Sequence, residues 1–70
     1  MDIREKVGNR IRDGRKLRNR TLIQLAEACD SSEAHLSKVE RGERQIGLLL
    51  LEKIAKSLNV SMVYFFEEEE

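Results

Sequence analysis

Side chains able to do covalent or metal chemistry are scarce in this 70-residue sequence. It contains one histidine, His35, and one cysteine, Cys29. With a single histidine we expect no Ser/His/Asp or Cys/His catalytic arrangement, and no glycine-rich phosphate loop is present. The same count leaves no zinc site, so we expect neither a metal nor a cofactor. Cys29 falls on an inward helix face and is expected to be a small core residue. The sequence therefore favours a protein that is not an enzyme.

Charge is distributed unevenly, although the formal net charge is zero. Residues 1–20 hold eight Lys/Arg against three acidic residues, residues 21–42 hold two against four, and residues 43–70 hold three against six. Such asymmetry is more informative than the total. It is compatible with a nucleic-acid partner, but a first helix that is merely solvated and laced with ion pairs explains it equally well.

Nothing in the sequence indicates export or a membrane. The first ten residues, MDIREKVGNR, carry charges every few positions and have no apolar run of the kind found in signal peptides. The longest apolar run, residues 48–51, is far too short to span a bilayer. A lone cysteine fits a reducing compartment. We expect a cytoplasmic protein.

Apolar residues recur at helical spacing along the chain, and no segment alternates as a strand does. Five helices are predicted, over about residues 3–18, 21–30, 32–41, 47–58 and 62–66. The residues predicted to face inward are Ile3, Val7, Ile11, Leu25, Ala28, Cys29, Leu36, Val39, Leu48, Leu51, Ile54, Ala55 and Leu58. The expected fold is one all-α domain over residues 1–70.

Polar residues that commonly cap helices stand at these boundaries. Thr21, followed by Gln24 three residues later, fits a capping box at the start of the second helix. Further candidate caps are Ser31, Ser32, Gly47 and Ser61 at helix starts, and Asn19, Gly42 and Asn59 at helix ends.

Residues 21–42 have the features of a helix-turn-helix, a motif whose second helix enters the DNA major groove while the first lies across the backbone. It needs a small residue where the two helices approach, here Ala26, and a short turn, here residues 30–32. The apolar residues that would lock the helices are Leu25, Cys29, Leu36 and Val39. Helical hairpins with other functions share parts of this pattern, so the pattern alone leaves both open.

At these residues the sequence resembles the lambda repressor-like (XRE/Cro) family of DNA-binding domains. The matching stretches are GNRIR (8–12), TLIQLAEA (21–28), HLSKVERGER (35–44) and LEKIAKSLNVS (51–61). The resemblance runs from about Val7 to Phe66 and implies a five-helix lambda repressor-like fold. It also implies that double-stranded DNA is the partner.

The resemblance assigns base contacts to the start of the second motif helix and to one turn further on. In this sequence those positions are Ser32, Glu33, Ala34, Ser37 and Lys38. Lys38 could donate to guanine O6/N7, Glu33 could accept from cytosine N4, and Ala34 or the ring edge of His35 could meet a thymine methyl. For Lys38 and Glu33 the alternative is an ordinary solvated side chain.

The resemblance also assigns phosphate contacts and an ion pair. The phosphate-contact positions are Arg18, Arg20, Thr21, Arg41, Arg44 and Gln45. Such contacts set register and make affinity salt-dependent without reading sequence. Arg15 and Glu40 occupy positions that pair in relatives as a partly buried structural ion pair.

Several positions depart from the family pattern. Relatives usually carry Gln at Leu22, Gly at Asp30 and an apolar residue at Ser31, so we expect one backbone contact to be missing at the second helix. Many relatives carry Leu at Gly14 and Arg20. We therefore expect a thinner core beside the first helix.

Extra apolar residues near the C-terminus indicate an interface, because a contiguous apolar patch beyond the core usually marks one. The residues concerned are Leu49, Leu50, Val63, Tyr64 and Phe66. A larger local core is the alternative. We expect a symmetric homodimer through residues 47–66, which would place two recognition helices about one DNA turn (roughly 34 Å) apart on a palindromic operator.

Two functions remain after these steps. The leading hypothesis is a sequence-specific transcriptional regulator from a bacterium or phage, either a repressor or an activator, with residues 32–41 in the major groove. The chain could be a whole regulator or the N-terminal domain of a longer one. The alternative is a protein-interaction module that kept the fold and lost DNA reading. It is supported by Leu22, Glu33, the zero net charge and the extra apolar surface.

Overall fold

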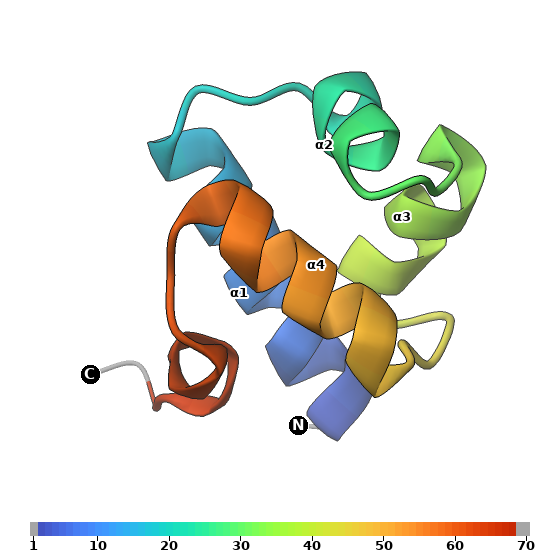
Figure 1. The fold of residues 1–70 in the computed structure, drawn as a ribbon. Helices are drawn as coiled ribbons and strands as arrows, with labels where there is room; N and C mark the ends of the chain where they lie inside the picture. The colour runs from blue at the N-terminus through green and yellow to red at the C-terminus, as the bar shows by residue number, and fades with distance from the viewer. Residues whose placement is uncertain (1, 69–70) are drawn as a thin grey trace.

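A computed structural model describes residues 2–68 as four α-helices followed by a short 3-10 helix. The elements are α1 (Ile3–Leu17), α2 (Leu22–Ala28), α3 (Glu33–Glu40), α4 (Leu48–Leu58) and η1 (Met62–Phe66). α2 and α3 lie together at one end of the molecule, α4 crosses α1, and η1 packs against α1 at the other end (Figure 1). This is the predicted all-α, lambda repressor-like fold. The part of the predicted domain formed by Met1, Glu69 and Glu70 lies outside the described residues.

The fifth helix differs from the expected α-helix. Residues 62–66 form a 3-10 helix, and Ser61 stands at its N-cap without making a side-chain hydrogen bond. Five residues close little more than one turn, and a 3-10 turn is the usual form of such a short helical piece.

Side-chain caps define the starts of the first three helices. The Thr21 side chain accepts a hydrogen bond from the Gln24 amide at 3.1 Å, and the Gln24 side chain accepts one from the Thr21 amide at 2.9 Å, which completes the predicted capping box. Ser32 caps α3 by accepting from the His35 amide. Asp2 caps α1 in a second capping box. The hydrogen bonds that Asp2 accepts from the Arg4 side chain and amide lower its pKa to about 2.

Residues in the left-handed backbone conformation follow the ends of the helices. Asn19 and Asn59, both predicted as end caps, have φ of 56° and 57°, and Gly42 has φ of 76°. Asp30, with φ of 55°, takes the turn position at which the family resemblance led us to expect glycine. Aspartate is one of the few residues besides glycine that enter this region at low cost, so the substitution keeps the turn.

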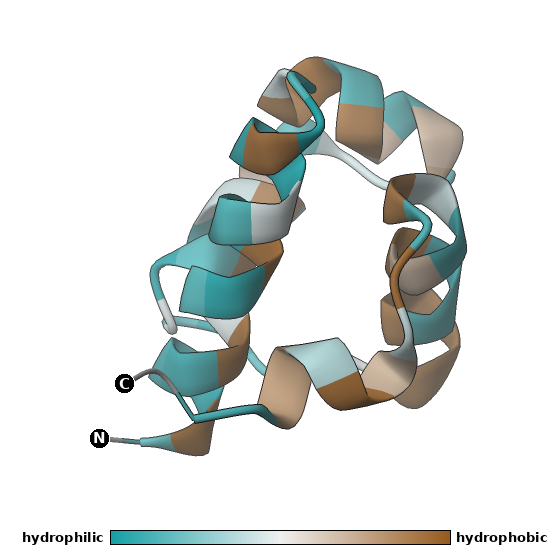
Figure 2. Ribbon diagram, turned by 90° about the vertical axis from the view of Figure 1, so that its left-hand side faces the viewer, coloured by the Kyte–Doolittle hydropathy of each residue, from teal (hydrophilic) through white to brown (hydrophobic). Residues whose placement is uncertain are grey.

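The core takes residues from all five elements. The fully or nearly fully buried apolar residues are Val7, Ile11, Leu25, Ala26, Cys29, Leu36, Val39, Leu51, Ile54, Ala55, Leu58 and Phe65. Figure 2 shows hydrophobic and hydrophilic residues interspersed along the longer helices, as expected for helices that bury one face. Burial raises the pKa of the Cys29 thiol, which makes this cysteine a poor nucleophile.

Three residues predicted to face inward are exposed instead: Ile3, Ala28 and Leu48. Each stands at the first or last residue of its helix. The helical period correctly predicts which face of each helix points toward the core. It does not predict how far the neighbouring helices extend to cover that face. Leu48, for example, is 74% exposed, whereas Leu51, one turn later, is 2% exposed.

The expected thinning of the core beside α1 is not found, because Tyr64 fills the space above Gly14. A Cβ on Gly14 would lie 3.2 Å from Tyr64 Cε2 and 3.3 Å from Leu58 Cδ1. The guanidinium of Arg10 stacks over the Tyr64 ring at 3.9 Å from its centroid, and Arg10 Nε donates to the Tyr64 carbonyl at 2.8 Å. Tyr64 of η1 thus covers the position at which the family resemblance led us to expect a leucine side chain from α1.

Candidate nucleic-acid interface

α2 and α3 form the predicted helix-turn-helix, with Asp30 and Ser31 in the turn. The Ser31 amide donates to the Ala26 carbonyl at 2.9 Å and closes the end of α2. The apolar residues predicted to lock the two helices are all buried: Leu25, Cys29, Leu36 and Val39. Ala26 is 3% exposed, consistent with its predicted place where the helices approach. α3 is therefore held on its inner side only.

The first turn of α3 presents small and polar side chains outward. Glu33 and Ala34 are exposed, and Lys38 and Ser37 are half-buried one turn later. Within residues 2–68 the Lys38 ammonium group has no ion-pair partner. The Ser32 hydroxyl accepts the capping hydrogen bond and keeps its own proton for an outside acceptor. The predicted base-contact residues thus all lie on α3, from its N-cap Ser32 to Lys38 in its last turn.

A charged cluster follows α3. Arg41 donates from Nε to Glu43 at 2.7 Å and from a terminal nitrogen to the Ser37 hydroxyl at 2.8 Å. The hydrogen bond from Arg41 lowers the pKa of Glu43, and the Glu43 carboxylate in turn raises the pKa of Arg41. Both side chains are about half exposed, so this pair is screened by solvent and contributes little to stability. Arg44 and Gln45, in the loop before α4, are exposed.

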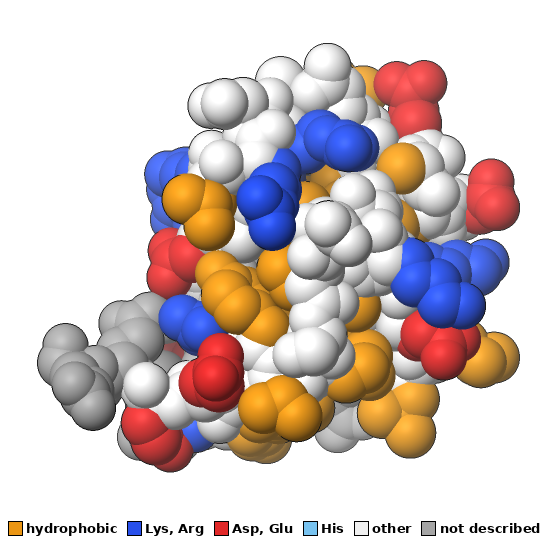
Figure 3. Space-filling model, turned by 60° about the vertical axis from the view of Figure 1, so that its left-hand side comes forward, with side chains coloured by type: hydrophobic (Ala, Val, Ile, Leu, Met, Phe, Trp, Pro, Cys, Tyr) orange, Lys and Arg blue, Asp and Glu red, His pale blue; other side chains and the backbone are white. Residues whose placement is uncertain are grey.

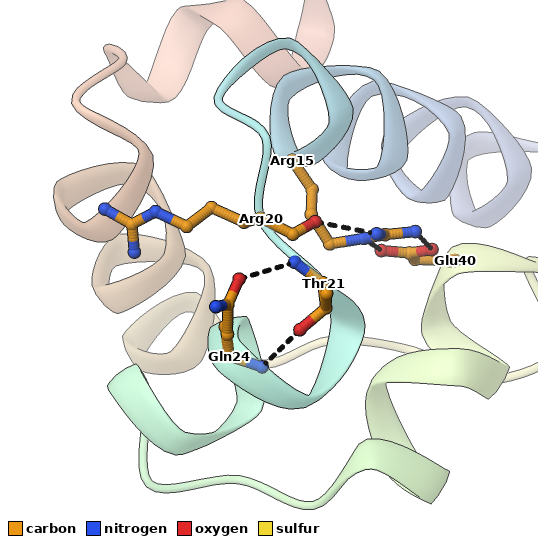
Figure 4. Close-up of polar contacts among 5 residues, drawn as sticks. All are labelled: Arg15, Arg20, Thr21, Gln24 and Glu40. Carbon is orange, nitrogen blue, oxygen red and sulfur yellow. Dashed lines mark hydrogen bonds and ion pairs between the residues drawn. The ribbon is translucent and has the colours of Figure 1, made fainter.

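The Arg15–Glu40 ion pair is present and forms the polar centre of the motif (Figure 4). Arg15 donates twice to the Glu40 carboxylate, at 2.8 and 3.1 Å, and once to the Arg20 carbonyl at 2.9 Å. The two side chains are only 13% and 7% exposed. Arg20 precedes Thr21, the N-cap of α2, so one guanidinium ties the end of α3 to the start of α2.

The other predicted phosphate contacts lie around the start of α2. Thr21 is exposed, and its hydroxyl caps α2 while retaining a proton to donate. The Arg20 side chain points away from the ion pair (Figure 4). Arg18 differs from the rest, because its Nε donates to the Leu58 carbonyl at the end of α4. Arg18 therefore stabilises a helix end with part of its guanidinium, and only the remaining N–H groups can reach a phosphate.

Two residues near the site were missed by the sequence predictions. Glu43 neutralises Arg41, and the only sequence signal for this was a two-residue separation at the end of a helix. Gly8 lies directly against the α3 backbone; it is the first residue of the family-like stretch GNRIR, but the sequence did not indicate this contact.

Exposed apolar residues lie on α4, on η1 and beside them. Of the predicted interface residues, Leu49, Val63 and Phe66 are exposed, whereas Leu50 and Tyr64 are half-buried against the core. Phe66 also lines an open hollow of about 610 Å³ together with Ile3 and Leu48. Figure 3 shows one face of the molecule, on which hydrophobic side chains are exposed between charged ones.

None of the described helices is both long and apolar enough to cross a membrane. Within residues 2–68, His, Cys, Asp and Glu side chains form no group that could hold a metal ion.

Comparison with known proteins places this geometry among regulators. A family model described as Helix-turn-helix (HTH_3) matches residues 11–65. The chain is 37% identical to an uncharacterized HTH-type transcriptional regulator, y4wC, of Sinorhizobium fredii, over 89% of its own length and 43% of that protein's. It is also 37% identical to the control protein C.SmaI of Serratia marcescens, over 89% of its own length and 74% of that protein's.

A solved structure agrees with this assignment. The clp gene regulator ClgR of Corynebacterium glutamicum superposes with a TM-score of 0.92 at 32% identity, over 94% of this chain and 70% of that one. The described fold therefore matches that of a known gene regulator over nearly the whole chain.

Proposed function

This chain belongs to the helix-turn-helix (HTH_3) family of DNA-binding transcriptional regulators, and we propose that it recognises a specific palindromic operator as a homodimer. In this proposal residues 1–70 are one domain, in which residues 21–42 bind DNA and residues 47–66 pair two copies. The family is not one of enzymes. A regulator of this kind works on bacterial or phage DNA, which places it in the cytoplasm.

One observation carries the proposal. The first turn of α3 exposes Glu33 and Ala34, and Lys38 follows one turn later without an ion-pair partner inside the described chain. Buried apolar residues fix the inner side of α3 against the core, so its outer side is free to enter a DNA groove. We assign base contacts to Ser32, Glu33, Ala34, Ser37 and Lys38.

Phosphate contacts would flank this surface. We assign them to Arg20, Thr21, Arg41, Arg44 and Gln45, with a smaller part for Arg18. Arg15 bonds both the Arg20 carbonyl, just before α2, and Glu40, at the end of α3. The start of α2 and the loop after α3 are therefore held at a fixed separation. Contacts to the phosphates on both sides of a groove would fix how α3 enters it.

The protein-interaction alternative rests on a different observation, the exposed apolar residues Leu49, Val63 and Phe66. A homodimer interface accounts for them without loss of DNA reading, which is why we prefer it. Repression by operator occupancy would follow from such binding, and the dimerisation equilibrium would make it depend on the concentration of the protein.

The role of Lys38 gives a direct test. On a site selected from a random DNA pool by the wild-type protein, Lys38→Ala should weaken binding by about 1–3 kcal/mol, the value of one good base contact. Binding to random DNA should change little, because a base contact contributes only on the selected site. Fluorescence anisotropy on both DNAs measures the two affinities.

The stability of the variant and its matched control complete this test. Lys38→Ala should leave the urea midpoint almost unchanged, since the side chain has no ion-pair partner within residues 2–68. Lys53→Ala, a lysine on the exposed side of α4, should affect neither affinity. Equal losses on selected and random DNA would refute base reading by Lys38.

The proposed dimer is tested by substituting one exposed leucine inside the proposed interface and one outside it. Leu49 and Leu17 are 79% and 68% exposed, but only Leu49 lies in residues 47–66. Burying a leucine side chain contributes about 1.5–3 kcal/mol, so Leu49→Gln should weaken dimerisation at least about tenfold. Leu17→Gln should leave it unchanged. Sedimentation equilibrium measures both, and a wild-type monomer at tens of micromolar would exclude the dimer.

A further inference from the structure

α1 meets α3 backbone to backbone at Gly8. A Cβ at this position would lie 2.3 Å from the carbonyl oxygen of Val39 and 2.8 Å from that of Glu40. Both oxygens belong to the last turn of α3. A methyl group needs a separation of roughly 3.3 Å from such an oxygen. Any residue other than glycine would therefore move the two helices apart by about 1 Å.

Gly42 continues the same contact beyond the end of α3. A Cβ on Gly42 would lie 2.9 Å from the Cα of Glu5 and 2.6 Å from its Cγ. Glu5 and Gly8 are three residues apart and so share one face of α1. That face lies against residues 39–42, backbone to backbone at Gly8 and partly through the Glu5 side chain at Gly42. It thereby sets where α3 ends and where the loop bearing Arg41 and Arg44 begins.

We infer that Gly8 is a positioning residue for DNA reading, because it sets the distance and tilt of the recognition helix against α1. This inference rests on the proposed function of α3. α3 has eight residues, so its first turn lies about 10 Å from the anchored end. A displacement of 1 Å of the anchored end, carried along α3, is large compared with the roughly 0.5 Å range of hydrogen-bond lengths. Base contacts at Glu33 and Lys38 would be lost or lengthened while the core stays assembled.

Gly14 is the matched control. It lies in the same helix and would gain the same helix propensity on substitution by alanine. Its added Cβ would meet side-chain atoms of Tyr64 and Leu58, which belong to η1 and α4 and not to α3. Gly14→Ala therefore perturbs α1 without moving the recognition helix. Gly47, with no atom within 4 Å of its added Cβ, is a second control for the substitution itself.

The experiment compares the ratio of specific to random DNA affinity in the three variants and the wild type. Affinities are corrected for the folded fraction from urea denaturation, which removes the effect of stability. Gly8→Ala should lower the ratio by about tenfold or more, the equivalent of losing one base contact. Gly14→Ala and Gly47→Ala should keep the wild-type ratio. Residual dipolar couplings should show a changed angle between α1 and α3 in Gly8→Ala alone.

Other results would overturn the inference. A folded Gly8→Ala with the wild-type ratio, or with an unchanged angle, refutes it while leaving the proposed function intact. A wild-type protein that does not prefer any selected site refutes the proposed function and this inference with it. If Gly8→Ala does not fold, Gly42→Ala is judged by the same criterion after the same correction for the folded fraction. Its closest backbone contact is 2.9 Å where that of Gly8 is 2.3 Å, and its φ of 76° adds a backbone strain of its own.

Discussion

Replacing Arg15 by alanine should lower the free energy of unfolding by about 3–5 kcal/mol, the usual cost of removing one partner from a buried ion pair. The cost arises because the Glu40 carboxylate, 7% exposed, would stay buried without a partner. The Arg20 carbonyl would also lose its hydrogen bond. For a domain of this size the loss is comparable to the whole stability. Urea denaturation followed by circular dichroism measures it.

Arg41→Ala is the matched control for this experiment. Arg41 also pairs with a glutamate, but both side chains are 54% exposed, so the loss should stay within about 1 kcal/mol. A second variant separates burial of charge from packing. In Arg15→Met/Glu40→Leu no charge remains buried, and this pair should regain most of the lost stability. Equal losses for Arg15→Ala and Arg41→Ala would show that the buried pair has no special role.

The helices and their caps were predictable because the signals are local. Thr21 and Gln24 need only each other to cap α2, and Asn59 needs only its own left-handed backbone to end α4. Ile3 and Leu48 were predicted wrongly because burial at a helix end depends on where another helix stops. The burial of Gly14 under Tyr64 was not predicted for the same reason, because the two residues are fifty positions apart in the sequence.

The candidate site divides in the same way. The family resemblance supplied Arg15 and Glu40 as a pair, and the distances agree with it. It did not indicate that Arg18 bonds the end of α4 or that Glu43 bonds Arg41, because both contacts depend on the particular side chains of this chain. The close approach at Gly8 is a property of two backbones, and no local pattern encodes it.

The excess of basic residues at the start of the sequence is partly explained by ion pairs within the molecule. Within residues 2–68, four of the eight basic residues in segment 1–20 form ion pairs, namely Arg4, Lys6, Arg10 and Arg15. Glu67 and Glu68 supply two of the partners, so the acidic end of the chain offsets the basic start. The cations assigned here to phosphates are Arg18, Arg20, Arg41 and Arg44, and of these Arg41 also pairs with Glu43.

These few cations set the expected salt dependence of DNA binding. If Arg20, Arg44 and Arg41 of two protomers neutralise about six phosphates, with Arg41 exchanging Glu43 for a phosphate, the slope of log K against log salt should be near −5. Affinity for any DNA should then fall about 10³-fold between roughly 50 and 200 mM salt. Anisotropy titrations at four or five salt concentrations measure the slope.

Substitutions on and off the proposed surface separate phosphate contacts from the general field of the protein. Arg44→Ala should reduce the slope by about one per protomer, on selected and random DNA alike. Lys56→Ala should not change it, because this lysine lies beside Glu52 on the outer side of α4. A wild-type slope near zero would mean that no phosphates are neutralised. The exposed apolar residues of α4 and η1 would then be the main binding surface, as in the protein-interaction alternative.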